Sequence, residues 1–170
     1  LLGWASYACS FVKDLLEPPM LLIRSVPVAS FVILALIWIG SDGLSVFISF
    51  LVVIPMIYTG TLTGLEHTDR ELLEMSRVFS FSFFKRLRYI YIPAVHSYLL
   101  SSCRTALGMS WKSGVAAEVI GIPQASIGEQ LYYSKLYLDT AGLFAWTFAI
   151  IVISAVFERF FLSLLMRVRH

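Results

Sequence analysis

Charged residues are scarce in this sequence. Only 14% of its 170 residues are charged and 58% are hydrophobic, and the mean hydropathy is +0.80. A soluble domain carries about 25% charged residues, so this composition excludes an ordinary water-soluble core. Runs such as residues 31–38 lack the alternation of polar and apolar side chains that the strands of a membrane barrel require. Since a bilayer otherwise accommodates only helices, the sequence predicts an all-α membrane protein.

The residues that usually carry catalysis are also few. The two cysteines, Cys9 and Cys103, lie in apolar stretches, and we expect them to be packing residues, not a disulfide or a metal site. The three histidines form no i,i+4 pair, and Glu118 has neither a neighbouring histidine nor an aspartate pair in the sequence. A Gly-x4-Gly-Lys-Ser/Thr phosphate loop is absent. We therefore expect no enzyme activity and no metal or cofactor bound by this chain.

Five apolar stretches define the predicted helices. They cover residues 1–12, 25–40, 44–64, 90–120 and 141–166. A helix needs about 20 residues to cross the hydrocarbon, which the third and fifth stretches provide. The second reaches this length only with a tilt or a kink at Pro27, and the fourth must extend beyond the membrane. The first is too short to span, so we expect the sequence to begin inside a helix of one transmembrane domain that covers residues 1–170.

The connectors between these stretches alternate in charge. Residues 12–25, residues 65–89 and the C-terminal tail carry basic side chains, whereas residues 41–43 carry none and residues 121–140 only one. Basic connectors lie predominantly on the cytoplasmic side of a membrane. The pattern therefore predicts a cytoplasmic loop at 65–89, a cytoplasmic C-terminus and an extracytoplasmic loop at 121–140.

Both long connectors are predicted to contain helix. In 65–89 we expect Thr68 to cap a helix, followed by a second short amphipathic stretch at 81–87. The outer connector should form a short helix over 127–138. The apolar face of the first helix comprises Leu72, Leu73, Met75, Val78 and Phe79. On amphipathicity alone, an interfacial helix lying on the lipid is the simpler interpretation of 65–89.

The spacing of residues in this loop points to another role. Glu74-Met75-Ser76 is followed after three residues by Ser80, and after nine more by Ile90-Tyr91-Ile92-Pro93. This resembles the "EAA" signature of ABC importer permeases, Glu-Ala-Ala, three residues, Gly, nine residues, Ile-x-Leu-Pro. Met75 stands in place of the first Ala, and Ser80 in place of Gly. The change to Ser80 leaves open whether the turn there needs a positive φ, where glycine has the advantage.

The resemblance extends over nearly the whole sequence. Residues 25–29, 37–40, 71–74 and 117–121 are similar to segments of the sulfonate, taurine and nitrate permease group. The resemblance implies the transmembrane domain of a type I ABC importer, with about five helices or helix parts and cytoplasmic coupling helices present. Members have about six membrane helices, so we expect an N-terminal part to be missing.

The resemblance also implies partners and a location. We expect a multi-pass protein of the bacterial inner membrane, in contact with lipid and with no nucleic-acid partner. It would bind ABC ATPase subunits that use ATP and Mg, a second permease copy in a homodimer, and a substrate-binding protein near 121–140. The residues that the signature assigns to ATPase coupling are Glu74, Met75, Ser76, Ser80, Ile90, Ile92 and Pro93.

The fourth stretch carries polar residues on one side. At 100° per residue, Ser97, Arg104, Gly108, Trp111, Val115 and Glu118 lie within roughly 80° of one another, with Ser101 and Lys112 beside them. Charges at membrane depth usually face a cavity or a partner. The candidate residues for a translocation pathway are Ser101, Arg104, Gly108, Trp111, Lys112 and Glu118. Arg104 and Lys112 would attract an anionic solute, although Arg104 and Glu118 could equally pair with neighbouring helices.

Two other functions stay open. A channel or a secondary transporter would not need ATP, and the latter often shows inverted repeats and broken helices, which are not visible in this sequence. A membrane enzyme would need paired acids, a nucleophile with a base, or a metal cluster. The favoured interpretation is a permease subunit for a small anionic solute of the sulfonate, nitrate or taurine type, although the sequence does not fix the solute.

Overall fold

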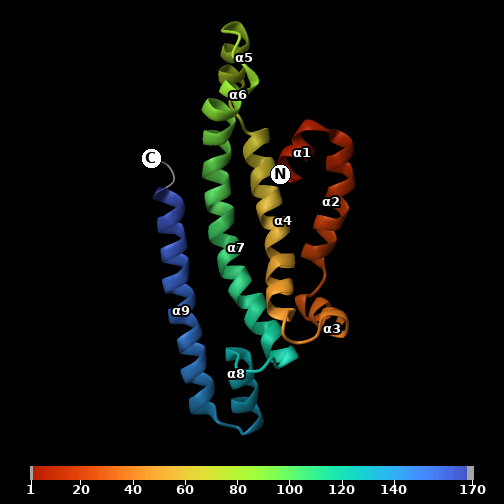
Figure 1. The fold of residues 1–170 in the computed structure, drawn as a ribbon, viewed down its shortest axis with the longest axis vertical. Helices are drawn as coiled ribbons and strands as arrows, with labels where there is room; N and C mark the ends of the chain where they lie inside the picture. The colour runs from red at the N-terminus through yellow and green to blue at the C-terminus, as the bar shows by residue number, and fades with distance from the viewer. Residues whose placement is uncertain (1, 168–170) are drawn as a thin grey trace. The chain divides into compact units, whose positions relative to one another are not determined.

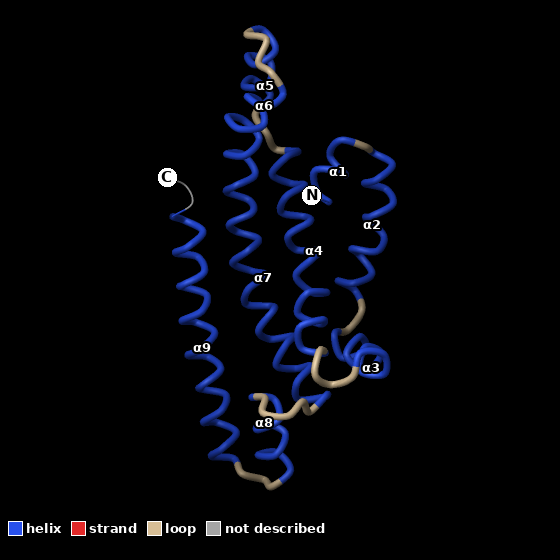
Figure 2. The backbone as a smooth tube through the Cα atoms, in the orientation of Figure 1, coloured by secondary structure: helices blue, strands red, loops and turns tan. Residues whose placement is uncertain are grey.

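The computed structural model describes residues 2–167, and these form helices joined by short connections (Figures 1 and 2). No strand occurs in this part of the chain, which confirms the all-α prediction. The elements are α1 (Leu2–Ala8), α2 (Ser10–Ser25), α3 (Val28–Ile39), α4 (Leu44–Glu66), α5 (Arg70–Val78), α6 (Phe83–Arg86), a π-helical turn (Leu87–Tyr91), α7 (Ile92–Gly121), α8 (Ile127–Leu136) and α9 (Thr140–Arg167).

Two helices are long and apolar enough to cross a membrane. These are α4 and residues Thr140–Leu165 of α9, as predicted for the third and fifth stretches. A third span is possible if α2 and α3 act as one broken span, since they are bent by 102° at the predicted kink near Pro27. The longest helix, α7, carries Arg104, Lys112 and Glu118 and does not meet the same test of length and composition.

The prediction that residues 12–25 form a connector is wrong. They belong to α2, which continues through Pro18 and Pro19. A proline inside a helix removes one backbone hydrogen bond but does not always end the helix. The basic residues that suggested a loop, Lys13 and Arg24, instead lie on this helix, and Lys13 forms an ion pair with Glu66 at the end of α4.

The chain divides into two compact units. One comprises the chain up to Leu21 together with Ile54–Thr105, and the other comprises Leu22–Val53 together with the chain from Ala106 onward. The long helices α4 and α7 each belong to both units, with one half of the helix in each unit.

In the first unit, α1 and α2 lie beside the second half of α4 (Figure 1). The Tyr58 hydroxyl donates a buried hydrogen bond of 3.0 Å to Oγ of Ser6, and Nζ of Lys13 lies 2.6 Å from Oε1 of Glu66. Gly60 and Gly64, one turn apart on α4, face the first half of α7. A Cβ atom at Gly64 would lie 2.9 Å from Cα of Val95, so these helices are in backbone-level contact. Small residues permit such an approach between membrane helices.

The second unit has its own apolar core. Buried side chains from α3, α4 and α7 meet there: Val32, Ala35, Leu44, Ile48 and Ala117. The helix α8 contacts α9 and lies beside the start of that helix (Figure 1). Only 6% of the most apolar segment of α9 is buried against the rest of the chain, so the large apolar side chains of this helix face outward. In a bilayer this surface contacts lipid or another membrane helix, and no cost of exposure to water arises.

The predicted N-cap of the helix in residues 65–89 is displaced by one residue. Asp69, not Thr68, is the N-cap of α5, and its carboxylate accepts a hydrogen bond of 2.8 Å from the Glu71 N–H. Thr68 follows the end of α4, and its hydroxyl donates back to the Gly64 carbonyl at 3.3 Å. The Thr68 hydroxyl is thus bonded back to α4. The carboxylate of the next residue, Asp69, accepts a hydrogen bond from a free backbone N–H at the start of α5.

Candidate functional site

The helices α5 and α6 lie beyond the ends of α4 and α7, at the tip of the first unit (Figure 1). Apolar side chains on α5 and directly after it are exposed here, and none of the described residues covers them. The exposed fractions are 42% for Leu72, 43% for Met75 and 68% for Phe79. These three positions share one side of the helix at 100° per residue. This exposed apolar surface, Leu72, Met75 and Phe79, is called the α5 face below.

The seven residues of the predicted coupling signature separate into two groups. Glu74, Met75, Ser80, Ile92 and Pro93 are exposed. Ser76 and Ile90 are buried, and the Ser76 hydroxyl donates to the Leu73 carbonyl at 2.7 Å. The structure therefore gives Ser76 and Ile90 a place inside the loop, and leaves the others available to a partner.

The end of α5 explains the small residue at position 80. The Phe81 N–H donates to the Ser76 carbonyl at 2.8 Å, and the Ser80 N–H donates to the Arg77 carbonyl at 3.0 Å. This pair of bonds is the Schellman arrangement, in which the residue after the cap adopts a left-handed conformation. Ser80 has φ +51°, so the turn does require the positive φ at which glycine is favoured.

Replacing Ser80 with glycine should therefore stabilise the end of α5 by about 1 kcal/mol, because a side chain in the left-handed region is unfavourable. Amide hydrogen exchange of the assembled permease should show slower exchange at Phe79 and Phe81. Ser82→Gly is the matched control, since Ser82 has φ −63° and gains nothing from glycine. Equal or faster exchange in the Ser80→Gly protein would contradict this explanation.

The connection from α6 to α7 is a continuous helix with one wide turn. The π-helical turn Leu87–Tyr91 comes directly before Ile92 and Pro93. Pro93 lies in the first turn of α7. A proline ring conflicts with the carbonyl four residues earlier in a regular helix, and a π turn changes that spacing.

An aromatic cluster fixes this connection to the first helix. The ring of Trp4 lies 5.2 Å from that of Tyr91 and 6.4 Å from that of Phe83, and Tyr7 lies 5.9 Å from Tyr91. Such edge-to-face pairs are each worth about 0.5–1.5 kcal/mol beyond burial. Sequence reasoning did not find this cluster, because nothing in the spacing of Trp4 and Tyr91 indicates that they meet.

The predicted pathway residues belong to both units. Ser101 and Arg104 lie exposed on the half of α7 that belongs to the first unit. Gly108, Trp111 and Lys112 lie in the second unit and line a cavity of about 540 Å³ beside α9. Its wall is completed by Leu107, Val115, Ile150, Ile151, Ser154 and Glu158.

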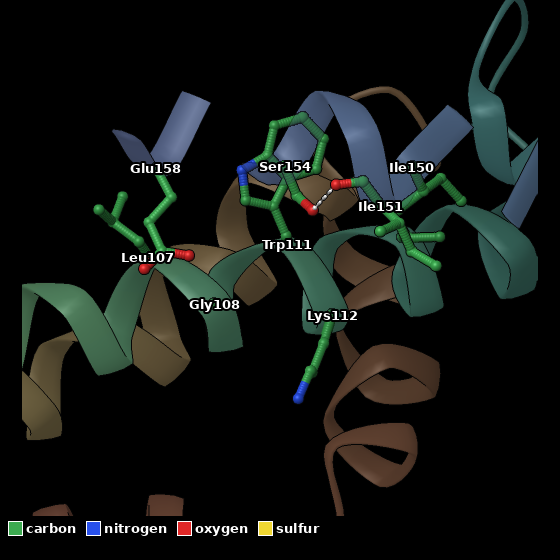
Figure 3. A pocket seen from close by; sticks show the side chains of 9 residues that line it. Leu107, Gly108, Trp111, Lys112, Ile150, Ile151, Ser154 and Glu158 are labelled. Atoms are coloured by element: carbon green, nitrogen blue, oxygen red, sulfur yellow. Dashed lines mark hydrogen bonds between the residues drawn. The ribbon is translucent and has the colours of Figure 1, made fainter. Parts of the chain in front are cut away.

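Figure 3 shows the charged groups of this cavity. The carboxylate of Glu158 turns towards Leu107 and Gly108, whereas the Lys112 ammonium points away from it. The Ser154 hydroxyl donates to the carbonyl of Ile151 in its own helix at 3.1 Å. Lys112 is exposed.

Glu118 has partners within the chain. Its Oε1 accepts a hydrogen bond of 3.2 Å from the Ser45 hydroxyl, and its Oε2 accepts one of 3.1 Å from the Gly128 N–H in the first turn of α8. A Cβ atom at Gly128 would lie 2.6 Å from the Glu118 carbonyl carbon, so only glycine permits this approach. The carboxylate thus joins α7 to the starts of α4 and α8, which favours the pairing role that the sequence left open.

A second cavity, of about 560 Å³, lies around Glu118. Ser45 and Ser49 of α4 line it, together with Trp111 of α7 and Phe157 of α9. The sequence analysis did not single out the two serines. A signal was present, because they stand four residues apart in the uncharged stretch 44–64 and therefore share one side of a helix.

Comparisons with known proteins agree with the architecture. Residues 2–170 match the model of the family described as "Binding-protein-dependent transport system inner membrane component". The chain is 25% identical to the putative aliphatic sulfonates transport permease protein SsuC of Bacillus subtilis, over 85% of this chain and 52% of the relative. It is 27% identical to a probable ABC transporter permease protein of Brucella melitensis, over 94% and 63%.

A third relative is the nitrate import permease protein NrtB of Synechocystis sp., with 25% identity over 84% of this chain and 56% of the relative. The chain thus spans between about half and two thirds of the length of these relatives. The family model covers almost the entire sequence, and the described residues form the apolar helices that a membrane component requires. The chain therefore belongs to the family of inner membrane components of binding-protein-dependent transport systems.

Proposed function

We propose that this chain is the core of a permease subunit that imports a small solute, driven by ATP that a separate ATPase hydrolyses. The observation that carries the proposal is the α5 face. Its apolar side chains lie exposed at the tip of the first unit, on a helix whose two ends are capped by local hydrogen bonds. A helix that is held in shape locally and left uncovered is suited to enter a groove of a partner protein.

The coupling signature takes separate roles in this proposal. Met75 contacts the ATPase, and the exposed carboxylate of Glu74 adds a directional polar contact. Ser76 and Ile90 hold the loop from inside, and Ser80 permits the turn that ends α5. Ile92 and Pro93 begin α7, so a displacement of α5 and α6 reaches the membrane through a continuous helix.

The arrangement in the membrane follows from the charge pattern. Residues 65–89 and the C-terminus face the cytoplasm of a bacterial cell, and residues 121–140 face outward, where a substrate-binding protein docks. Two copies of the subunit form the pathway between them. The exposed residues Ser101, Arg104 and Lys112 of α7 line it, and Gly108, Trp111 and Glu118 contribute through the cavities of the second unit.

The solute is proposed to carry a negative charge. Two relatives are named as permeases for aliphatic sulfonates and for nitrate, both of which are anions. In this chain, Lys112 supports the proposal because its ammonium is exposed beside an apolar cavity and points away from Glu158 (Figure 3). A cation at this depth attracts an anion more strongly than it would in bulk water.

Uptake into liposomes tests the proposal. The complete permease, reconstituted with its ATPase and its binding protein, should accumulate solute only when ATP is present. An ATPase whose catalytic site is inactivated is the matched control and should abolish uptake. Uptake that continues without ATP, or that follows an imposed ion gradient, would show a channel or a secondary transporter instead.

A further inference from the structure

A third cavity lies within the first unit, between α1, α4 and the beginning of α7. Trp4 and Thr61 contribute to its lining, together with residues of the π-helical turn and α7 between Leu87 and Leu99. The surface that these residues present to the cavity is almost entirely carbon. Their polar atoms scarcely reach it; the Thr61 hydroxyl, for example, donates to the carbonyl of Ile57 in its own helix at 2.8 Å. The cavity therefore favours an apolar occupant over a polar solute.

The dimensions of this cavity suit a long and narrow group. Its volume is about 230 Å³, below the range of typical small-molecule sites. Leu87 and Leu99 are separated by about 18 Å along a helix at 1.5 Å per residue, so this small volume is drawn out along the helix. Ile92 in the lining is exposed, and the cavity is therefore open to the surroundings of the protein. In a bilayer, those surroundings are lipid.

Close helix packing fixes the walls of the cavity. A Cβ atom at Gly3 would lie 2.9 Å from Cβ of Thr61, so α1 and α4 touch beside the cavity. A Cβ atom at Gly64 would lie 2.9 Å from Cα of Val95, so α4 and α7 touch as well. Thr61 and Val95 both belong to the lining. The cavity is therefore a feature of the packed helices and not a gap left by flexible side chains.

Unpaired positive charge lies next to this cavity in the sequence. Lys85, Arg86 and Arg88 lie in α6 and the π-helical turn, and no acidic residue occurs between Glu74 and Glu118. Within the described part of the chain, the side chains of Lys85 and Arg88 are exposed and form no ion pair or hydrogen bond. Arg86 differs, because its Nε donates to a backbone carbonyl of the same loop at 3.3 Å. Two cations are thus available to an anion from outside the chain.

Helix geometry places these cations at one end of the cavity. Arg88 stands four residues before Ile92, and Lys85 three residues before Arg88, so the three share one side of the helix. From Ile92 the lining continues to Leu99, away from α6. Tyr89, beside the cations in the sequence, is exposed, and tyrosine is enriched where the hydrocarbon meets the headgroups. The cavity thus extends from headgroup level, at the two cations, towards the hydrocarbon.

We propose that this cavity binds an anionic phospholipid, with one acyl chain along α7 and the phosphate at Lys85 and Arg88. A guanidinium binds phosphate through charge-assisted hydrogen bonds, and an ammonium attracts it as a point charge. A zwitterionic lipid also has a phosphate, but its own cation would lie among the same basic residues. Under the proposed orientation the lipid belongs to the cytoplasmic leaflet, where anionic lipids attract basic segments beside a membrane helix. The inference does not depend on the transported solute.

Photochemical labelling tests the site in the assembled complex of permease and ATPase in nanodiscs. The probe is phosphatidylglycerol that carries a photoactivatable group in one acyl chain, and phosphatidylcholine with the same chain is the comparison. Mass spectrometry of peptides gives the label on residues 87–99 relative to the label on α9, whose apolar side chains also face outward. We expect this relative labelling to be about fivefold higher with phosphatidylglycerol. Equal relative labelling with the two lipids would overturn the proposal.

Charge variants separate a bound headgroup from a general attraction of the protein for anions. In the Lys85→Gln/Arg88→Gln protein, the preference for phosphatidylglycerol should vanish. Arg70→Gln/Arg77→Gln is the matched control, because it removes the same charge from exposed positions on α5 and should leave the preference unchanged. Equal effects of the two double variants would overturn the proposal.

Filling the cavity tests the place of the acyl chain. Leu99 is half-buried and lines the end of the cavity remote from the cations, so Leu99→Trp should reduce the labelling of residues 87–99 to the level on α9. If this variant does not assemble, His96→Trp serves the same purpose. Labelling that persists in the assembled variant would overturn the inference. So would residues 87–99 that stay unlabelled in the parent complex, because another protein segment then fills the cavity. Labelling needs no transport, so either result leaves the proposed function intact.

Discussion

Replacing both Met75 and Phe79 with lysine should abolish association of the permease with its ATPase while the chain still folds. Both side chains are exposed, at 43% and 68%, so their removal deletes little internal packing. If they fill a groove of the ATPase, two charged groups in that groove would be desolvated without partners. Losses at such central positions commonly reach about 2–4 kcal/mol, so we expect a weakening of about a hundredfold or more.

Co-purification in detergent and ATPase stimulation by the binding protein measure this effect. Leu138→Lys is the matched control for co-purification only, because Leu138 is 85% exposed but lies in the connection between α8 and α9, where the binding protein and not the ATPase is proposed to dock. The control should retain full association. A Met75→Lys/Phe79→Lys protein that still stimulates the ATPase would refute the coupling role of the α5 face, and an interfacial helix on the lipid would become the better interpretation of this segment.

Gly60→Ala should reduce the stability of the first unit by about 3 kcal/mol, the upper range for overpacking in a well-packed core. A Cβ atom at this position would overlap Oγ of Ser102 and lie 2.6 Å from its Cβ. The Cβ atom of serine cannot rotate away, so α4 and α7 must separate. Thermal unfolding of the purified permease should show a lower midpoint and a lower yield of folded protein.

Two variants make this prediction specific. Ser102→Gly in the same protein removes the obstructing atoms, after which the next nearest is the Tyr98 carbonyl oxygen at 3.4 Å, so most of the lost stability should return. Gly108→Ala is the control on α7, because nothing lies within 4 Å of the added atom. It should be neutral or slightly stabilising, by up to about 1 kcal/mol. A Gly60→Ala protein as stable as Gly108→Ala would contradict the close helix contact.

Local pattern was enough to predict several elements. The uncharged stretch 44–64 and the stretch 141–166 correspond to α4 and α9, because a long apolar run has few alternatives to a membrane helix. The bend at Pro27 and the short helix α8 also followed from local chemistry. Glu74 and Ser80 were assigned through the resemblance to the permease signature, which lies within one continuous segment, and their role in coupling stays a prediction.

Contacts between distant segments were not predictable in the same way. The sequence did not indicate that residues 12–25 continue as helix, and the Lys13–Glu66 pair joins residues that are 53 positions apart. Likewise, the polar stripe on α7 suggested one continuous pathway. Its residues divide between two units, where Gly108 and Trp111 line a cavity with α9 and Glu118 is bonded to Ser45 and Gly128.

The sequence by itself determined that this is a helical membrane protein with the permease signature, because hydrophobicity and motif spacing are properties of a single segment. Only the tertiary structure decided what the segments do together. It placed Ser80 in a left-handed turn, left the α5 face uncovered and bonded Glu118 to Ser45 and Gly128. These outcomes depend on which helices approach one another, and that is set by packing at positions such as Gly60 and Gly128, which carry no chemical signal of their own.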